Sequence, residues 1–344
     1  DMFNTAVGFS AGTAVTTGQY NTLIGSQAGD AITTGGSNVA VGYFALSTED
    51  GHGLNVAVGN RALANQNAGA NAYNVAVGTD AGYSINTGVE NTLVGGLAGD
   101  ALTSSADNTA VGYQALGSAT TGNENTAVGH SALFTNILSD RNVALGLDTL
   151  RNHDQASSID SYNVAVGYNT GAAVTTGVQN TLIGALAGDA LTDADYNVAI
   201  GYSSLSADTL GSKSTAIGVG ALESQRPVDG SGNDVATDMY NTAVGYTAGL
   251  SVSTGTINTL VGALAGDAIT TGSENAALGY ESAGELTVGV KNTALGAYAL
   301  RVDTEGSQSV AVGHQALAAQ QFTSATTAYN VAVGANAGVS VITG

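Results

Sequence analysis

A five-residue phrase, Asn-Thr-Ala-Val-Gly at its first occurrence in residues 4–8, recurs through the whole chain of 344 residues. Fourteen of the eighteen spacings between its copies are 17 residues, and the other four are 19, 21, 27 and 21. A periodic chain grows by stacking units rather than by enlarging one core. We therefore predict one repetitive domain over residues 1–344. The nineteen copies begin at Asn4, Asn21, Asn38, Asn55, Asn74, Asn91, Asn108, Asn125, Asn142, Asn163, Asn180, Asn197, Ser214, Asn241, Asn258, Asn275, Asn292, Ser309 and Asn330.

The phrase has the composition of a short strand. Position 3 is Ala or Leu, position 4 is always Val, Ile or Leu, and position 5 is always Gly. Small and β-branched residues bounded by Asn and Gly favour a strand. Thr-Gly pairs such as Thr17-Gly18 predict a second turn, and hence two short strands per unit. Because 17 residues cannot form an independent core, we predict an all-β, parallel β-solenoid of about nineteen 17-residue coils.

Alternation along the strand predicts which side chains face inward. Positions 2 and 4 point one way and position 3 points the other. Since position 4 is always large and apolar, we expect it to face the interior, with the Ala of position 3 (such as Ala40) outside. A small apolar outer face predicts a cover, most simply other copies of the chain in a three-fold bundle. The alternative is a single rod with an Ala-lined face.

Two other positions have expected structural roles. Asn at position 1 should stack into a ladder of amides along one edge. Gly at position 5 should supply a φ that other residues avoid, or allow two backbones to approach closely.

The copies fall into groups of coils, residues 4–73, 74–162, 163–240, 241–329 and 330–344. In the second coil of the first four groups, position 3 is Leu and position 6 is small, whereas position 6 is often Tyr elsewhere. This exchange predicts volume compensation between positions 3 and 6 in a packed layer. The Leu residues concerned are Leu23, Leu93, Leu182 and Leu260.

All four irregular spacings fall just before a new group opens. They place insertions at residues 65–72, 152–161, 223–239 and 319–328, which should bulge outward because stacked strands cannot absorb them. The longest insertion is the candidate contact loop, although such a segment can also be a merely tolerated insertion. Its candidate residues are Arg226, Pro227, Asp229 and Asp234.

Charge and composition exclude several classes of function. Seven basic against 27 acidic residues give a net charge of −20, which excludes nucleic-acid binding. Cysteine is absent, so disulfides and thiolate metal sites are excluded. No apolar run approaches 18 residues, and we expect no membrane insertion of this segment.

Candidate chemistry is sparse. The four histidines show no metal-ligand spacing and no Ser/His/Asp set can be assembled, so we predict no catalytic or cofactor-binding residue and no enzyme activity. The acidic patch Asp189, Asp193 and Asp195 is a weak calcium candidate. The recurring Ala-Gly-Asp-Ala aspartates, of which Asp189 is one, are better explained as turn residues.

Residues 108–116 read Asn-Thr-Ala-Val-Gly-Tyr-Gln-Ala-Leu, and Thr120-Thr121-Gly122 follows. These phrases resemble the shaft repeats of phage tail fibres and large surface fibre proteins. The chain is also similar to the heads of trimeric autotransporter adhesins of the YadA type, although their repeat is usually shorter. The resemblance implies a homotrimeric, left-handed parallel β-roll exposed outside a cell or on a virion.

The functional expectation is therefore a structural one. We expect the shaft or head of an extracellular fibrous protein, an adhesin or a phage tail fibre, that mediates or supports attachment. The alternative is an extracellular filament built by end-to-end stacking of solenoid subunits. The expected partners are further copies of the chain and a cell-surface or glycan target. Because the pattern of residues 1–5 reappears at residues 238–242, the chain reads as a segment of a longer one.

Overall fold

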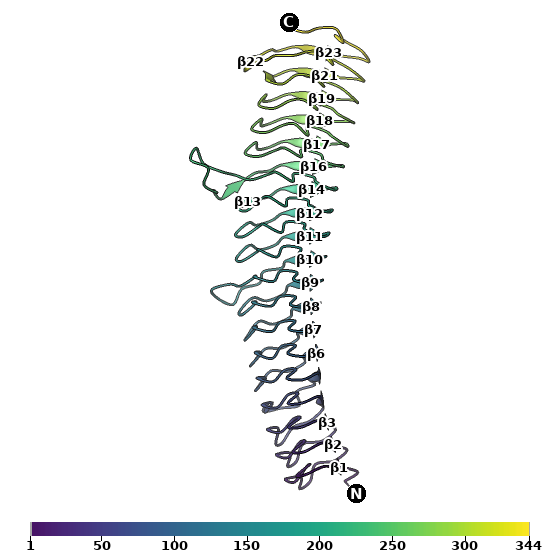
Figure 1. The fold of residues 1–344 in the computed structure, drawn as a ribbon, viewed down its shortest axis with the longest axis vertical. Helices are drawn as coiled ribbons and strands as arrows, with labels where there is room; N and C mark the ends of the chain where they lie inside the picture. The colour runs from purple at the N-terminus through teal and green to yellow at the C-terminus, as the bar shows by residue number, and fades with distance from the viewer. Residues whose placement is uncertain (1, 344) are drawn as a thin grey trace. The chain divides into compact units, whose positions relative to one another are not determined.

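The computed structural model describes residues 2–343, and these residues form strands and turns without any helix. The fold is a parallel β-solenoid of about 19 coils of about 17 residues (Figure 1), which confirms the predicted fold class. Residues up to Tyr168 form one compact unit, and residues from Asn169 onward form a second. The division falls inside the coil that opens the group 163–240, so the sequence groups do not mark it.

In the first unit, each coil contributes one three-residue strand, made of positions 2–4 of the phrase. Successive strands pair in parallel and in register, so that Thr109 lies opposite Thr126. The strands are β1 (Thr5–Val7), β2 (Thr22–Ile24), β3 (Val39–Val41), β4 (Val56–Val58), β5 (Val75–Val77), β6 (Thr92–Val94), β7 (Thr109–Val111), β8 (Thr126–Val128), β9 (Val143–Leu145) and β10 (Val164–Val166).

The second unit repeats this arrangement and adds two short pairings, β13 with β15 and β20 with β22. The register is again residue to equivalent residue, as for Thr242 opposite Thr259. The strands are β11 (Thr181–Ile183), β12 (Val198–Ile200), β13 (Gly211–Ser212), β14 (Thr215–Ile217), β15 (Thr237–Asp238), β16 (Thr242–Val244), β17 (Thr259–Val261), β18 (Ala276–Leu278), β19 (Thr293–Leu295), β20 (Gly306–Ser307), β21 (Val310–Val312), β22 (Thr326–Thr327) and β23 (Val331–Val333).

The prediction of two short strands in every coil is wrong, because most of each coil consists of tight turns. In the coil of Asn125, the residues Glu124, Ser131 and Leu133 have φ of 56°, 53° and 49°. Left-handed conformations are unfavourable for residues other than Gly. They are held by hydrogen bonds from these N–H groups to carbonyls of neighbouring coils, at 3.0 to 3.1 Å.

The strand faces opposite to the predicted direction. Position 3 is buried in the interior, as at Ala110, while position 4 points outward, as at Leu145, which is 37% exposed. The interior is narrow and already holds the large apolar side chains of positions 9 and 12, such as Leu116 and Leu102. Only a small residue fits beside them in most coils, so Ala marks the inside of this strand.

The Leu exchange also has a different partner from the predicted one. Position 3 and position 6 lie on opposite sides of the wall, so they cannot compensate for each other. Leu93 instead fills the interior space beside two glycines at position 9, Gly82 of the preceding coil and Gly99 of its own coil. A Cβ added at Gly82 would lie 2.8 Å from its Cδ1, and one at Gly99 would lie 2.9 Å from its Cδ2. Where position 3 is Ala, position 9 is usually Leu.

The amide ladder is confirmed, but it lies in the interior rather than along an exposed edge. Oδ1 of Asn91 accepts the backbone N–H of Asn108 at 3.1 Å. Nδ2 of Asn91 donates to the carbonyl of Ser105 at 2.8 Å, which ties the strand to the turn of the same coil. Asn91 thus joins two coils and closes one. Most other Asn residues at position 1 do the same, but Nδ2 of Asn55 has no hydrogen-bond partner among the described residues.

Both explanations for Gly at position 5 hold. Gly112 has φ of 134°, and a Cβ placed on it would lie 2.5 Å from the carbonyl oxygen of Gly129. The conformation and the close stacking of the coils therefore both require Gly here.

Candidate functional site

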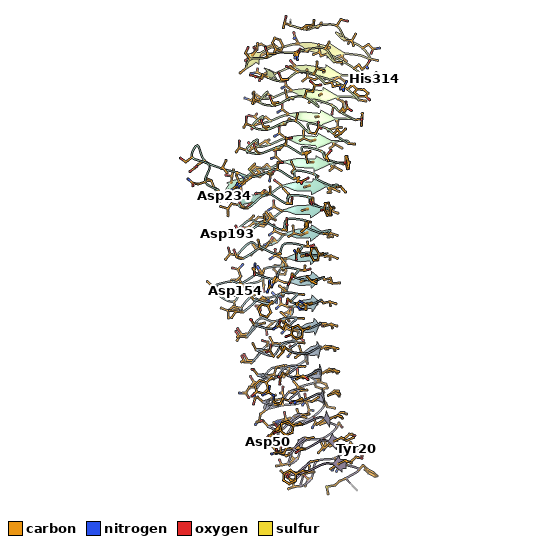
Figure 2. All side chains as sticks on the ribbon, viewed as in Figure 1. Tyr20, Asp50, Asp154, Asp193, Asp234 and His314 are labelled. Atoms are coloured by element: carbon orange, nitrogen blue, oxygen red, sulfur yellow. The ribbon has the colours of Figure 1, made fainter. Side chains whose placement is uncertain are left out.

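The longest insertion forms a hairpin-like loop that projects from the coils of the second unit (Figure 2). Nε of Arg226 donates to Oδ1 of Asp234 at 2.6 Å across its base. The N–H of Val235 donates to the carbonyl of Pro227 at 2.9 Å. The predicted contact residues therefore brace the loop, and Pro227 is buried.

The tip of this loop is organised by Asp229. Its Oδ1 accepts the N–H of Ser231 at 2.8 Å and the N–H of Asn233 at 3.0 Å. The hydrogen bonds from Asn233 lower the pKa of Asp229 below its usual value. Gly230 and Gly232 beside it have nothing within 4 Å of an added Cβ, so the tip is open to a partner.

The calcium candidates are held by separate contacts. Oδ1 of Asp193 accepts the hydroxyl of Thr176 at 2.7 Å, and Oδ1 of Asp195 accepts the N–H of Val178 at 2.8 Å. Burial raises the pKa of Asp189 and of Asp195. In the part of the chain that the structure describes, these three carboxylates do not form a group with all ligand atoms within 4.8 Å of one another. Calcium binding there stays a prediction.

The outer strand face carries a row of apolar side chains in each unit. Position 4 supplies one Val, Ile or Leu per coil, and adjacent parallel strands are about 4.8 Å apart. Exposed aromatic residues at position 6 and before position 1 flank this row. Contiguous apolar surface of this kind marks interaction sites. The aromatic residues are Phe3, Phe9, Tyr20, Tyr43, Tyr73, Tyr113, Tyr162, Tyr168, Tyr196, Tyr202, Tyr240, Tyr246, Tyr280 and Tyr329.

A hollow of about 480 Å³ lies on the surface of the first unit, near the insertion 65–72. Tyr43, Phe44 and Tyr83 line it together with Arg61. The guanidinium of Arg61 lies 4.8 Å from the centre of the Tyr83 ring and makes two 2.7 Å hydrogen bonds to Asp80. Aromatic faces with a few polar groups are typical of sites for small ligands.

Sequence reasoning missed a series of buried polar pairs at coil position 12. This position is apolar in most coils, but it is polar in the last two coils before each insertion. Both members of each pair are buried, and the second member lies within the first three residues of the insertion. The signal in the sequence was the change from apolar to polar residues at position 12 in these coils. The pairs are Glu49 with Gln66, Asn136 with His153, Asp208 with Gln225, and Asp303 with Gln320.

Two of these pairs are hydrogen-bonded in the same way. Nε2 of Gln225 donates to Oδ2 of Asp208 at 2.5 Å, and Nε2 of Gln320 donates to Oδ2 of Asp303 at 2.6 Å. Burial raises the pKa of Asp208 to about 6. A buried carboxyl of this kind favours its neutral form.

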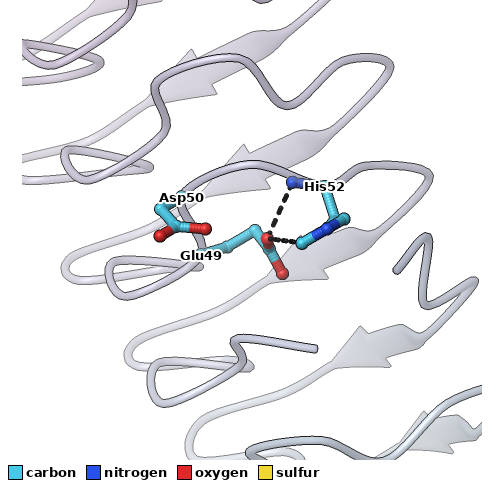
Figure 3. A group of neighbouring side chains, drawn as sticks. All are labelled: Glu49, Asp50 and His52. Atoms are coloured by element: carbon cyan, nitrogen blue, oxygen red, sulfur yellow. Dashed lines mark hydrogen bonds and ion pairs between the residues drawn. The ribbon is translucent and has the colours of Figure 1, made fainter. Parts of the chain in front are cut away.

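The first pair has a different environment. Glu49 lies beside His52 and close to Asp50 (Figure 3). Oε1 of Glu49 accepts the N–H of His52 at 3.0 Å and lies 3.5 Å from its Nδ1. Within residues 2–343 this is the one group of three or more His, Cys, Asp or Glu residues with all ligand atoms within 4.8 Å of one another. The clue in the sequence was the compact Glu-Asp-Gly-His run.

No family model matches the chain, and no curated protein sequence matches it either. None of the described residues belongs to a helix long and apolar enough to cross a membrane.

Proposed function

We propose that the chain is the shaft or head of an extracellular fibrous protein, an adhesin or a phage tail fibre, that supports attachment rather than catalysis. The observation that carries the proposal is the outward row of Val, Ile and Leu at position 4. A row of this kind costs free energy in water unless something covers it. Further copies of the same chain are the simplest cover, because their rows have the same spacing.

The homotrimer rests on this exposed face together with the resemblance to trimeric fibres. A partner covers Leu145 and its neighbours. The flanking tyrosines lie at the rim of this interface, where the apolar ring contacts the partner and the polar hydroxyl faces water. This argument replaces the one from an outer Ala face, since Ala lies inside.

Attachment to a target is proposed for features that lie apart from the strands. The open tip of the 223–239 insertion and the aromatic hollow at Tyr43 offer contact surfaces, and a cell-surface glycan is the proposed target. Binding of the labelled chain to immobilised glycans tests this part, with Tyr43→Ala and Tyr113→Ala as a pair. Both tyrosines occupy position 6, but only Tyr43 lines the hollow. Equal loss in both variants, or no glycan binding at all, contradicts the assignment.

The alternative is a self-assembling filament in which coils of successive subunits stack end to end. The register between coils favours it, because successive strands pair residue to equivalent residue and a coil of another subunit could pair in the same way. Sedimentation or light scattering on the purified chain separates the two. A discrete trimer supports the fibre, open-ended polymers support the filament, and a monomer overturns both.

A further inference from the structure

We propose that Glu49, Asp50 and His52 bind a divalent transition-metal cation of the Zn²⁺ type at the turn that follows β3. The argument starts from a comparison inside the chain itself. Asp208 and Asp303 occupy the same coil position as Glu49 and serve as built-in reference sites without a neighbouring imidazole.

One carboxylate oxygen, Oε1 of Glu49 or Oδ1 of Asp208 and Asp303, makes the same hydrogen bond at all three sites. It accepts the N–H of the residue three positions later, at 3.0 Å for Glu49, 2.7 Å for Asp208 and 3.0 Å for Asp303. Turn closure therefore explains why an acidic residue is buried at this position. It does not explain the other differences at Glu49.

The second oxygen separates Glu49 from its counterparts. At Asp208 and Asp303, Oδ2 accepts a hydrogen bond from the Gln of the next coil. At Glu49 the next coil also carries a Gln, Gln66, but neither Oε2 of Glu49 nor Nε2 of Gln66 has a hydrogen-bond partner among the described residues. Glu49 is fully buried, so this oxygen has lost water. The backbone N–H of Ala68 lies near the carboxylate and acts to lower its pKa, but no donor of the described residues reaches Oε2 within hydrogen-bond geometry.

The side chains beside Glu49 supply the other ligands. Where the counterpart sites have Thr209 and Thr304, this site has Asp50, and where they have Gly211 and Gly306, it has His52. The carboxylate of Asp50 and the ring of His52 both lie on the turn next to Glu49 (Figure 3). All three ligand atoms lie within 4.8 Å of one another. Nδ1 of His52 has no hydrogen-bond partner in the described residues.

The distances suit a small tetrahedral ion. Two ligands bound at about 2.0 to 2.1 Å in tetrahedral geometry are about 3.4 Å apart. Oε1 of Glu49, the oxygen that also accepts the His52 N–H, lies 3.5 Å from Nδ1 of His52, which is close to this separation. Asp50 is exposed, so its side chain can rotate toward the ion at small cost.

The donor set selects the class of metal. One imidazole nitrogen and two carboxylates suit Zn²⁺ and its neighbours, whereas Ca²⁺ prefers six to eight oxygen ligands. The His52 side chain is 31% exposed, so solvent can reach the site and complete the coordination. The bound ion would neutralise a buried carboxylate and fix the turn one coil before the first insertion.

Isothermal titration of the full chain with Zn²⁺, and Co²⁺ absorption spectroscopy, test the proposal at neutral pH. We expect one ion per chain, a tetrahedral Co²⁺ spectrum and no competition by Ca²⁺. Loss of a residue that only hydrogen-bonds a metal ligand typically lowers metal affinity about 10- to 100-fold. Loss of a ligand itself should cost more, so His52→Ala should lower the affinity at least about a hundredfold. Glu49→Gln keeps an acceptor for the His52 N–H and should also abolish tight binding.

His130→Ala is the matched control, because His130 lies in the same unit beside Tyr113 and Ser131 and outside the cluster. It should bind one ion with unchanged affinity. Circular dichroism of His52→Ala checks that the variant folds; we expect that it does, because Nδ1 makes no hydrogen bond to the described residues and loses only its 3.5 Å contact with Glu49. Absence of Zn²⁺ and Co²⁺ binding to the unmodified chain overturns the proposal, as does binding that survives His52→Ala.

Discussion

Gln225 donates a hydrogen bond from Nε2 to Oδ2 of Asp208, 2.5 Å away and one coil earlier. The same Nε2 lies 3.0 Å from Oγ of Ser214, and Oε1 of Gln225 accepts Nδ2 of Asn241 at 2.9 Å. All four side chains are fully buried. The solenoid thus joins three coils through one polar network just where the longest insertion leaves the stack.

Replacing Gln225 by Ala should destabilise the second unit. The change leaves a buried carboxylate and a buried Asn amide without their partner, and we expect a loss of about 3 kcal/mol in the free energy of unfolding. Chemical denaturation followed by circular dichroism measures it. Gln179→Ala is the control at an exposed position and should change the midpoint little. A small effect at Gln225 would show that water replaces its hydrogen bonds.

Stability should also depend on pH through Asp208. Burial raises its folded-state pKa to about 6, against 3.8 for an unperturbed Asp side chain. The folded protein therefore binds the proton more tightly than the unfolded chain. Protonation of Asp208 therefore stabilises the folded state by about 3 kcal/mol. This stabilisation is complete below about pH 4 and is lost as pH rises to about 6.

The measurement is the denaturation midpoint between pH 4 and pH 7 at constant salt, compared with Asp208→Asn. We expect the unmodified protein to be less stable at pH 7 than at pH 4, and the variant to lose most of this slope. Asp229→Asn, at the exposed loop tip, should retain it, because the pKa of Asp229 is lowered rather than raised. Equal slopes in all three proteins would assign the effect to the overall charge of −20 instead.

The stacking distance can be tested at a position 5 glycine. Gly112→Ala places a Cβ 2.5 Å from the carbonyl oxygen of Gly129, at φ of 134°. Neither backbone can move without breaking the coil stack, so we expect a loss of at least about 3 kcal/mol or failure to fold. Gly230→Ala adds the same atom where nothing lies within 4 Å. Similar behaviour of the two variants in thermal unfolding would contradict this reading of the repeat.

The sequence predicted the solenoid because spacing and residue type agreed in every coil. Alternation separated position 3 from positions 2 and 4, but it could not tell which side was inside. Size was a misleading criterion, since the narrow interior accepts Ala110 only because Leu116 fills the remaining space. The pattern that identifies the inner face is the exchange of Leu between positions 3 and 9. It can be interpreted only once both positions are known to face the same interior space.

The functional residues were predicted unevenly for a similar reason. The 223–239 insertion was visible because it breaks a period, and the structure shows it projecting. The buried pairs were missed because Gln66, Gln225 and Gln320 read as the polar start of each insertion. Only the stack shows that each lies next to a carboxylate of the preceding coil, to which Gln225 and Gln320 donate hydrogen bonds.

The Leu exchange leads to a double-variant test at Leu93 and Gly99. Leu93→Ala alone should cost about 2 to 5 kcal/mol, because it leaves a cavity between the position 9 glycines. Gly99→Leu alone should overpack against Leu93. The combined variant recreates the Ala-and-Leu pattern of the next coil, where Leu116 also has positive φ, and should recover much of the stability. Additive losses in chemical denaturation would show that the two positions do not share one space.

The outward strand face makes the final prediction, which concerns association rather than folding. Leu145→Glu places a charge in the middle of the apolar row of the first unit, where Leu145 is 37% exposed. In a trimer it would be buried with its symmetry mates, so we expect dissociation to monomers that keep the circular dichroism of the unmodified chain. Thr17→Glu changes an exposed turn residue away from this face and should leave the sedimentation coefficient unchanged. A Leu145→Glu protein that remains trimeric would exclude this row as the interface and assign association to another surface of the coils.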